Sequence, residues 1–191
     1  MKKNNEIKEK IIRVTTELIE KSDGNIEAIT IRSISEKAGI GVGLINYHFQ
    51  TKENLIEICV QKIIEDVISK FKPGIDEKLS YKERIKMAAK SVIDFLMENQ
   101  AVSRISIIGD HYNPQVLDNT MKTVQGFSSY LKDLEISDKD KKILLFGFVS
   151  TLQTAFLRKD LSKELFGLDF YIKEERDSFI DIIVDSFFKG D

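Results

Sequence analysis

Residues 35–55 read SEKAGIGVGLINYHFQTKENL, and this stretch decides the fold. It places glycine at three alternate positions, Gly39, Gly41 and Gly43, between segments whose apolar residues recur at helical spacing. Glycine adopts the left-handed conformation that ends many helices, so we expect Gly39 to end one helix and Gly41 to open the next. Gly43 falls inside that second helix, where glycine costs about 1 kcal/mol relative to alanine, which indicates close approach of another surface. The pattern predicts a helix-turn-helix.

Helical geometry sorts the residues of the second helix of this pair into two faces. Ile45 and Phe49 are apolar and four positions apart, so we expect both to point inward. The residues expected on the outer face are Val42, Gly43, Leu44, Asn46 and Tyr47. This face carries no charge, which is unusual for a solvated helix. It suits the floor of a DNA major groove, where valine and leucine meet thymine methyls and asparagine pairs with adenine.

The composition of the 191-residue chain is that of a globular protein, with 42% hydrophobic and 31% charged residues. Only two prolines occur and apolar residues recur every three or four positions, so the predicted fold class is all-α. The net charge of −2 argues against a nucleic-acid partner, although residues 1–52 are slightly basic and the remainder slightly acidic.

Cysteine and membrane signals point to the cytoplasm. The single cysteine, Cys59, excludes an intramolecular disulfide framework, and we expect it to be a small core residue. The chain has no signal-peptide pattern at its start and no run of about 18 apolar residues, so no membrane partner is expected.

Helices are expected along the whole chain. The first contains Ile7, Ile11, Val14 and Leu18 on one stripe and ends near residues 23–24. The others are expected at residues 31–38, 42–48, 52–71, 80–99, 102–108, 114–134, 137–157 and 172–188.

Residues 30–55, TIRSISEKAGIGVGLINYHFQTKENL, resemble the DNA-binding signature of TetR/AcrR-type transcriptional regulators. Three positions depart from that signature. Ser35 replaces alanine, Gly41 replaces a serine that caps the helix, and Asn46 replaces a tyrosine that commonly contacts a phosphate. The positions that match are Thr30, Ile34, Ala38, Gly39, Gly43, His48, Phe49, Lys52, Glu53 and Leu55.

The resemblance implies a three-helix DNA-binding domain at residues 1–52. Lys52 lies in the first turn of a helix, where the helix N-terminus also attracts phosphate. The alternatives are an ordinary surface lysine for Lys52, a solvated side chain for Arg32, and packing against the first helix for Tyr47 and His48. The expected DNA-binding residues are Thr30, Arg32, Val42, Gly43, Leu44, Asn46, Tyr47, His48 and Lys52.

The resemblance also implies that residues 53–191 form a helical bundle that binds a small-molecule effector and holds a homodimer. Candidate effector-binding residues are Phe95, Arg104, His111, Tyr112, Phe127, Tyr130, Phe148 and Gln153, together with Asp110. The aromatic residues among them are most simply explained as core, although such residues also line apolar cavities between helices. No second His or Cys follows His111 at ligand spacing, so no metal site is predicted.

Two helices have the composition expected of a dimer interface. Small residues recur along residues 137–157, and an apolar stripe runs along residues 172–188. The alternative is that both helices pack only within one subunit. The candidate interface residues are Gly147, Thr151, Thr154, Phe179, Ile183 and Phe187.

These observations favour a homodimeric, ligand-responsive transcriptional regulator, in this family usually a repressor, bound to a palindromic double-stranded DNA operator. The alternative is a DNA-binding factor of the same fold without an effector. An all-α enzyme is a further alternative. The sequence contains no Ser/His/Asp or Cys/His set and no phosphate-binding loop, so neither enzymatic activity nor a cofactor is predicted.

Overall fold

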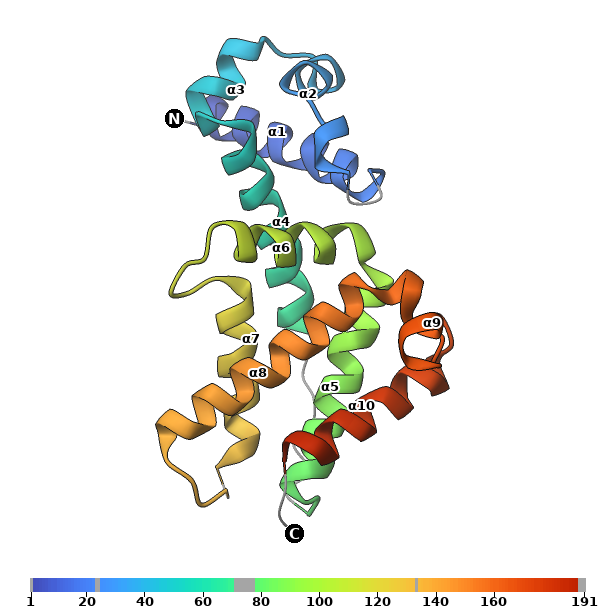
Figure 1. The fold of residues 1–191 in the computed structure, drawn as a ribbon. Coiled ribbons are helices and arrows are strands. Elements are labelled where there is room, and N and C mark those ends of the chain that lie inside the picture. The colour runs from blue at the N-terminus through green and yellow to red at the C-terminus, as the bar shows by residue number, and fades with distance from the viewer. Residues whose placement is uncertain (1, 23–24, 71–77, 133, 189–191) are drawn as a thin grey trace. The chain divides into compact units, whose positions relative to one another are not determined.

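The computed structural model describes residues 2–22, 25–70, 78–132 and 134–188. All regular elements in this part of the chain are helices, which confirms the all-α class (Figure 1). None of the described helices combines the length and the apolar character that crossing a membrane requires. The chain divides into two compact units, and each is described by itself.

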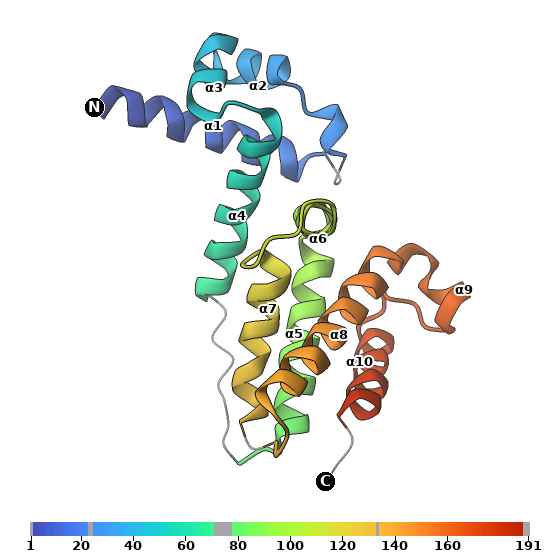
Figure 2. The same cartoon turned by 60° about the vertical axis from the view of Figure 1, so that its left-hand side comes forward.

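The front unit contains the helix-turn-helix. Its elements are α1 (Lys2–Glu20), η1 (Ile26–Ala28), α2 (Ile31–Ala38), α3 (Val42–Phe49), α4 (Lys52–Lys70) and the Gln100–Ile108 part of α6 (Gln100–Tyr112). Helix α1 packs along α2 and α4, and α3 lies between α2 and α4 in the chain and contacts both (Figure 2). The predicted helix ends at residues 23–24 and 71 lie outside the described residues.

One apolar core holds the front unit together. Ile11 of α1, Ile34 of α2, Phe49 of α3 and Leu55 of α4 are completely buried in it. Cys59 is also buried there, and burial raises the pKa of its thiol to about 11. A thiol that stays protonated in an apolar core is a packing residue, as expected from the sequence.

Packing places α4 with the helices of the helix-turn-helix. Leu55, Ile56 and Val60 of α4 belong to the same core as α1, and so do Val102 and Ile105 of α6. The boundary expected between residues 52 and 53 therefore does not coincide with the division by packing, because these apolar side chains tie α4 to α1. As a boundary between functions it stays a prediction.

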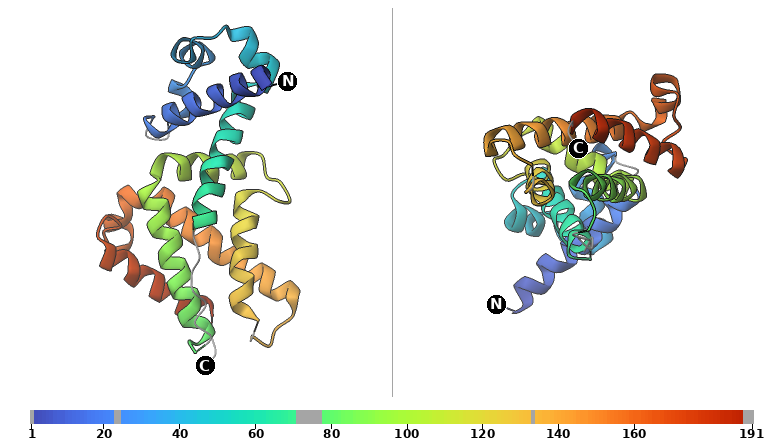
Figure 3. Two further views of the ribbon diagram at one scale, coloured as in Figure 1. Left: turned by 180° about the vertical axis from the view of Figure 1, so that it is seen from behind. Right: turned by 90° about the horizontal axis from the view of Figure 1, so that it is seen from below.

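The rear unit is a second helical bundle. Its elements are α5 (Tyr81–Glu98), the end of α6, α7 (Asn119–Ser128), η2 (Ser129–Leu131), α8 (Asp138–Leu157), η3 (Lys159–Leu161), α9 (Ser162–Phe166) and α10 (Lys173–Phe187). Helix α5 lies against α10, and α7 lies against α8 (Figure 3). The Phe148 ring centroid lies 5.5 Å from that of Phe127 and 5.3 Å from that of Phe188, so aromatic rings fill the centre of this unit.

Helices α6 and α7 have boundaries that differ clearly from the prediction. Helix α6 continues through Gly109 to Tyr112 and stops only at Asn113, because the proline that follows disfavours helical backbone there. Helix α7 begins later, after Asp118, whose carboxylate accepts the Met121 N–H at 2.8 Å. The short helices η3 and α9 were not expected.

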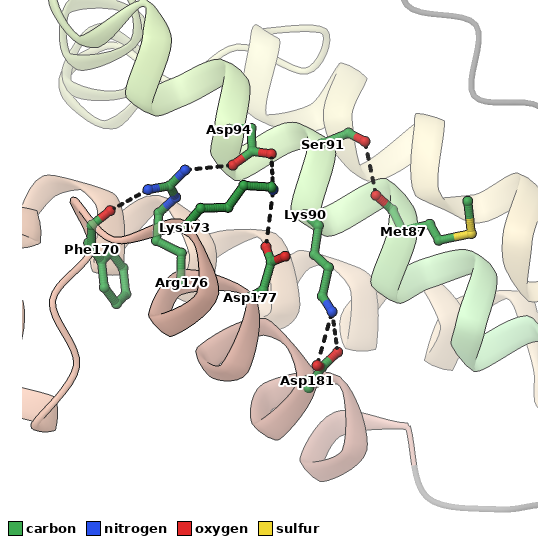
Figure 4. Close-up of polar contacts among 9 residues, drawn as sticks. All are labelled: Met87, Lys90, Ser91, Asp94, Phe170, Lys173, Arg176, Asp177 and Asp181. Carbon is green, nitrogen blue, oxygen red and sulfur yellow. Dashed lines mark hydrogen bonds and ion pairs between the residues drawn. The ribbon is translucent and has the colours of Figure 1, made fainter.

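Ion pairs join α5 to α10 along one side of the rear unit (Figure 4). The two helices run antiparallel, so residues four positions apart on α5 pair with residues four positions apart on α10. The nitrogen–oxygen distance is 2.9 Å in both Lys86–Asp185 and Lys90–Asp181. Partly exposed pairs of this kind contribute only about 0.2–1 kcal/mol each. Their main effect is therefore to set the register between the two helices.

Asp94 of α5 pairs with two cations near the start of α10, Lys173 and Arg176. Arg176 is buried and donates from Nη2 to Asp94 Oδ1 and from Nη1 to the Phe170 carbonyl, both at 2.7 Å. Lys173 also donates to Asp94. Burial by itself would raise the pKa of Asp94, but the hydrogen bonds from Lys173 and Arg176 outweigh it and lower this pKa below its ordinary value.

We predict that Asp94→Asn lowers the free energy of unfolding by about 2 kcal/mol at pH 7, because Arg176 stays buried without its counter-charge. The folded-state pKa of Asp94 is depressed, so its stabilisation is present at neutral pH and is lost as the pH falls below about 4, the ordinary pKa of aspartate. The free energies of unfolding of the two proteins, measured by urea titration, should therefore approach each other as the pH is lowered below about 4. Asp177→Asn is the matched control, since Asp177 meets only Lys173, at 3.5 Å. Equal stabilities at pH 7 would contradict the role of Asp94.

Candidate nucleic-acid interface

The turn between α2 and α3 is built from the residues that the sequence singled out. Thr30 caps α2, because its Oγ1 accepts the Ser33 N–H at 3.0 Å and its own N–H donates to Ser33 Oγ. Gly39 ends α2 in the left-handed conformation, with φ 62°. Gly41 then opens α3 without a side-chain cap. These are the roles predicted for Gly39 and Gly41.

Helix α3 has one buried face and one exposed face, as predicted. Ile45 and Phe49 are completely buried. Val42, Gly43, Leu44, Asn46 and Tyr47 are exposed, and none carries a charge. The exposed face of α3 therefore offers apolar groups, one amide and one phenol to a partner.

Gly43 has no packing role within the chain. A Cβ atom added at this position would meet no atom within 4 Å. Glycine inside a helix nevertheless costs about 1 kcal/mol relative to alanine. The open space beside Gly43 is therefore compatible with a surface outside the protein, such as the edge of a DNA groove.

Tyr47 and His48 lie at the end of α3. Tyr47 is 72% exposed, while His48 is half-buried with its ring 5.1 Å from the Tyr47 ring in an edge-to-face arrangement. His48 Nε2 is buried and makes no hydrogen bond among the described residues. This geometry favours a direct DNA contact for Tyr47 and a supporting role for His48.

The charged candidates make weak contacts in the free protein. Arg32 is highly exposed and pairs with Glu36 at 2.9 Å, an i,i+4 pair worth only about 0.3–0.5 kcal/mol. Lys52 is half-buried, and its Nζ donates to the Ile26 carbonyl at a long 3.4 Å. An ammonium group has three donors, so Lys52 keeps the capacity to bind a phosphate.

A comparison with protein families identifies the domain that these helices form. Residues 11–59 match the family described as bacterial regulatory proteins, tetR family. The chain carries the DNA-binding domain of TetR-family transcriptional regulators. The match runs from α1 through the helix-turn-helix into α4, which confirms the resemblance drawn from residues 30–55. A search of curated proteins finds no match to the chain.

The TetR-type domain also contains a feature that the sequence analysis missed. Gln50 joins α3 to α4 with φ 65° and ψ −55°, and the Asn54 side chain donates to the last carbonyl of α3. No pattern of residue types marks a single side-chain bond to a main-chain carbonyl, so only the coordinates reveal it.

In the rear unit, the candidate effector residues fall into buried and exposed groups. Phe127, Tyr130 and Phe148 are buried against one another, as the core explanation expects. Phe95 is half-buried and Gln153 is buried.

His111 and Tyr112 are exposed, and Arg104 is an exposed residue of the front unit. Asp110, by contrast, belongs to a polar network. Its Oδ2 accepts the Thr120 N–H and hydroxyl at 2.7 and 2.8 Å, and Thr120 Oγ1 also accepts a hydrogen bond from Gln153 at 3.0 Å.

The candidate dimer residues lie mostly inside the rear unit. Phe179 and Ile183 are only 9% exposed. Phe187 packs against Phe148, and a Cβ added to Gly147 would approach the Phe187 ring to 3.3 Å. The small size of Gly147 is therefore explained by packing within one subunit. Thr151 is half-buried, and Thr154 is exposed.

We predict that Asn46→Ala relaxes the sequence preference at one base pair of each half-site and weakens binding to an adenine-containing site by about 1–3 kcal/mol. The contrast is Lys52→Ala, which should weaken binding to all sequences alike and reduce the salt slope by about 1 per contact. Both variants are titrated against a panel of single-base operator variants at several salt concentrations. If Asn46→Ala shows the wild-type ranking of the panel, Asn46 does not read a base.

Proposed function

We propose that this protein is a ligand-responsive repressor that binds a palindromic operator as a homodimer. The observation that carries the proposal is the exposed, uncharged face of α3, held on a TetR-type domain by the burial of Ile45 and Phe49. Asparagine can pair with adenine in the major groove and apolar side chains can meet the thymine methyl group, so a neutral face of this kind can read base edges. A regulator that binds operator DNA in this way is expected to act in the cytoplasm.

Two recognition helices are needed for a palindromic site. A two-fold dimer places them in successive major grooves, about 34–36 Å apart. Specificity then depends on both the face of α3 and the distance between the two copies.

Exposed apolar side chains on α8 and α10 support self-association. Ile143, Phe146 and Thr154 are exposed and recur along α8 at helical spacing, and Ile182 is exposed on α10. A shallow hollow of about 420 Å³ follows at the end of α8, lined by Thr154, Leu157, Arg158, Asp160 and Leu161. We therefore place the dimer interface on the outer faces of these helices rather than on the buried residues Phe179 and Ile183.

We predict that Phe146→Glu yields a folded monomer. Phe146 is 51% exposed, so the substitution leaves the core intact but buries a charge in the interface. Loss of the second half-site contact should weaken operator binding on the order of 100-fold or more. Light scattering and operator titration measure the two effects.

Two further variants sharpen this test. Met87→Glu replaces a similarly exposed apolar residue, 54% exposed, on α5 and should stay dimeric. Ile183→Glu should unfold the rear unit instead, because Ile183 is buried. A Phe146→Glu protein that remains dimeric would move the interface to another surface.

The response to a ligand is proposed to pass through α6. Residues Gln100–Ile108 of this helix belong to the front unit, whereas Gly109–Tyr112 belong to the rear unit. Val102 and Ile105 lie in the core that also contains α3 and α4, while Asp110 bonds to Thr120 of α7. A ligand that shifts the last turn of α6 thereby acts on the DNA-binding unit through one continuous helix.

We predict that an effector found by a thermal-shift screen lowers operator affinity by about 5- to 150-fold, the range of an allosteric coupling of about 1–3 kcal/mol. The effector stabilises the form that does not bind DNA, so the operator must in turn weaken effector binding. Titrating the operator with and without each hit measures this coupling. Tight ligands that leave operator affinity unchanged would favour the alternative, a DNA-binding factor of the same fold without an effector.

A further inference from the structure

The corner between α3 and α4 is strained. Gln50 is the one non-glycine residue with positive φ in the described part of the chain, at φ 65° and ψ −55°. The Thr51 N–H donates to the Phe49 carbonyl at 2.7 Å, which closes a three-residue γ-turn around Gln50. A γ-turn of this hand is rare and strained for a residue with a Cβ atom, and it persists only where the surroundings hold it.

The Asn54 side chain of α4 helps to hold the turn at Gln50 in place. Asn54 Nδ2 donates to the Phe49 carbonyl at 2.9 Å, so this carbonyl accepts two hydrogen bonds. The backbone N–H of Asn54 donates to Thr51 Oγ1 at 3.1 Å, which fixes Asn54 on the first turn of α4. The Phe49 side chain is completely buried in the front core. The last residue of α3 is therefore anchored through both its side chain and its main chain.

This corner controls the direction of the recognition helix. Only Gln50 and Thr51 separate α3 from α4, and α3 is eight residues long. A helix this short behaves as a rigid rod, so a change of the Gln50 dihedral angles turns the whole exposed face of α3. Asn46 and Tyr47 lie within four residues of the corner and turn with it.

We propose that Asn54 is a positioning residue for DNA recognition: its amide holds the strained turn at Gln50 and so fixes the orientation of the exposed face of α3. The inference rests on the proposed DNA-reading role of that face. A purely structural explanation is that Asn54 stabilises the start of α4. The two explanations differ in what a glycine at position 50 does.

The test compares Asn54→Ala, Gln50→Gly and the double variant. The DNA probe is the duplex that the wild-type protein selects from a random-sequence library, against a random duplex of the same length. Asn54→Ala should weaken binding to the selected duplex about tenfold, the effect of losing one part-buried hydrogen bond. Binding to the random duplex, which depends on phosphate contacts, should change less than about twofold.

Rescue separates positioning from mere stability. Glycine adopts positive φ without strain, so Gln50→Gly should restore the double variant to within about threefold of wild-type affinity. Asn99→Ala is the matched control: its amide nitrogen donates to the Phe95 carbonyl at 3.1 Å, within the rear unit. It should leave the ratio of selected to random binding unchanged even if it lowers the melting temperature.

Amide hydrogen exchange in the DNA-free protein provides a second readout. Asn54→Ala should speed exchange of the Thr51 N–H, and Asn99→Ala should not. Unchanged selectivity in Asn54→Ala, or a double variant as weak as Asn54→Ala alone, would overturn the positioning role. A wild-type protein that selects no duplex from the library would instead overturn the proposed function, while the exchange data would still report on the corner.

Discussion

The burial of Phe49 is the contact on which the DNA-binding surface depends. Helix α3 has only eight residues, and a helix of this length is not stable by itself in water. Its position comes from Ile45 and Phe49, which are completely buried against α1, α2 and α4. Because these two side chains must point into the core, the opposite face of α3 is forced outward. The same constraint that makes the helix stable therefore decides which residues are offered to DNA.

The exposed face of α3 is suited to discrimination more than to affinity. It carries no charge. Asn46 stands where the resembled signature has a tyrosine that commonly contacts a phosphate, and Gly41 leaves α3 without a side-chain cap. In the proposed complex, attraction to the DNA backbone comes from cations outside α3, such as Lys52 at the start of α4 and Arg32 on α2. A division of this kind leaves Asn46 free to act on bases, and it makes the exact orientation of α3 important, because few backbone contacts correct an error in it.

The sequence predicted the helix-turn-helix well and the rear unit only in part, for physical reasons. Glycine at a helix end has one structural meaning, so Gly39 was placed correctly. The apolar stripe with Phe179 and Ile183 has two possible meanings, because the sequence pattern is the same whether the stripe packs within its own subunit or against a partner. In this structure both side chains are buried within the subunit. Gly147 was ambiguous in the same way, because its neighbour Phe187 is distant in sequence. The bond from Asn54 to the Phe49 carbonyl follows from geometry that no residue pattern encodes.

The packing also constrains how a signal reaches DNA. Val102 and Ile105 of α6 share one apolar core with α1, α3 and α4, and such cores are close-packed and deform little. A movement of α6 therefore displaces the DNA-binding unit as a body more readily than it bends α3 against α4. The two hydrogen bonds on the Phe49 carbonyl reinforce this behaviour, since they hold the corner at which α3 joins α4. In a dimer, displacement of a rigid unit changes the separation of the two recognition helices while each keeps its face intact. Regulation of the proposed dimer would then alter the distance between the two recognition helices, which the operator must match, and would leave base reading within each half-site unchanged.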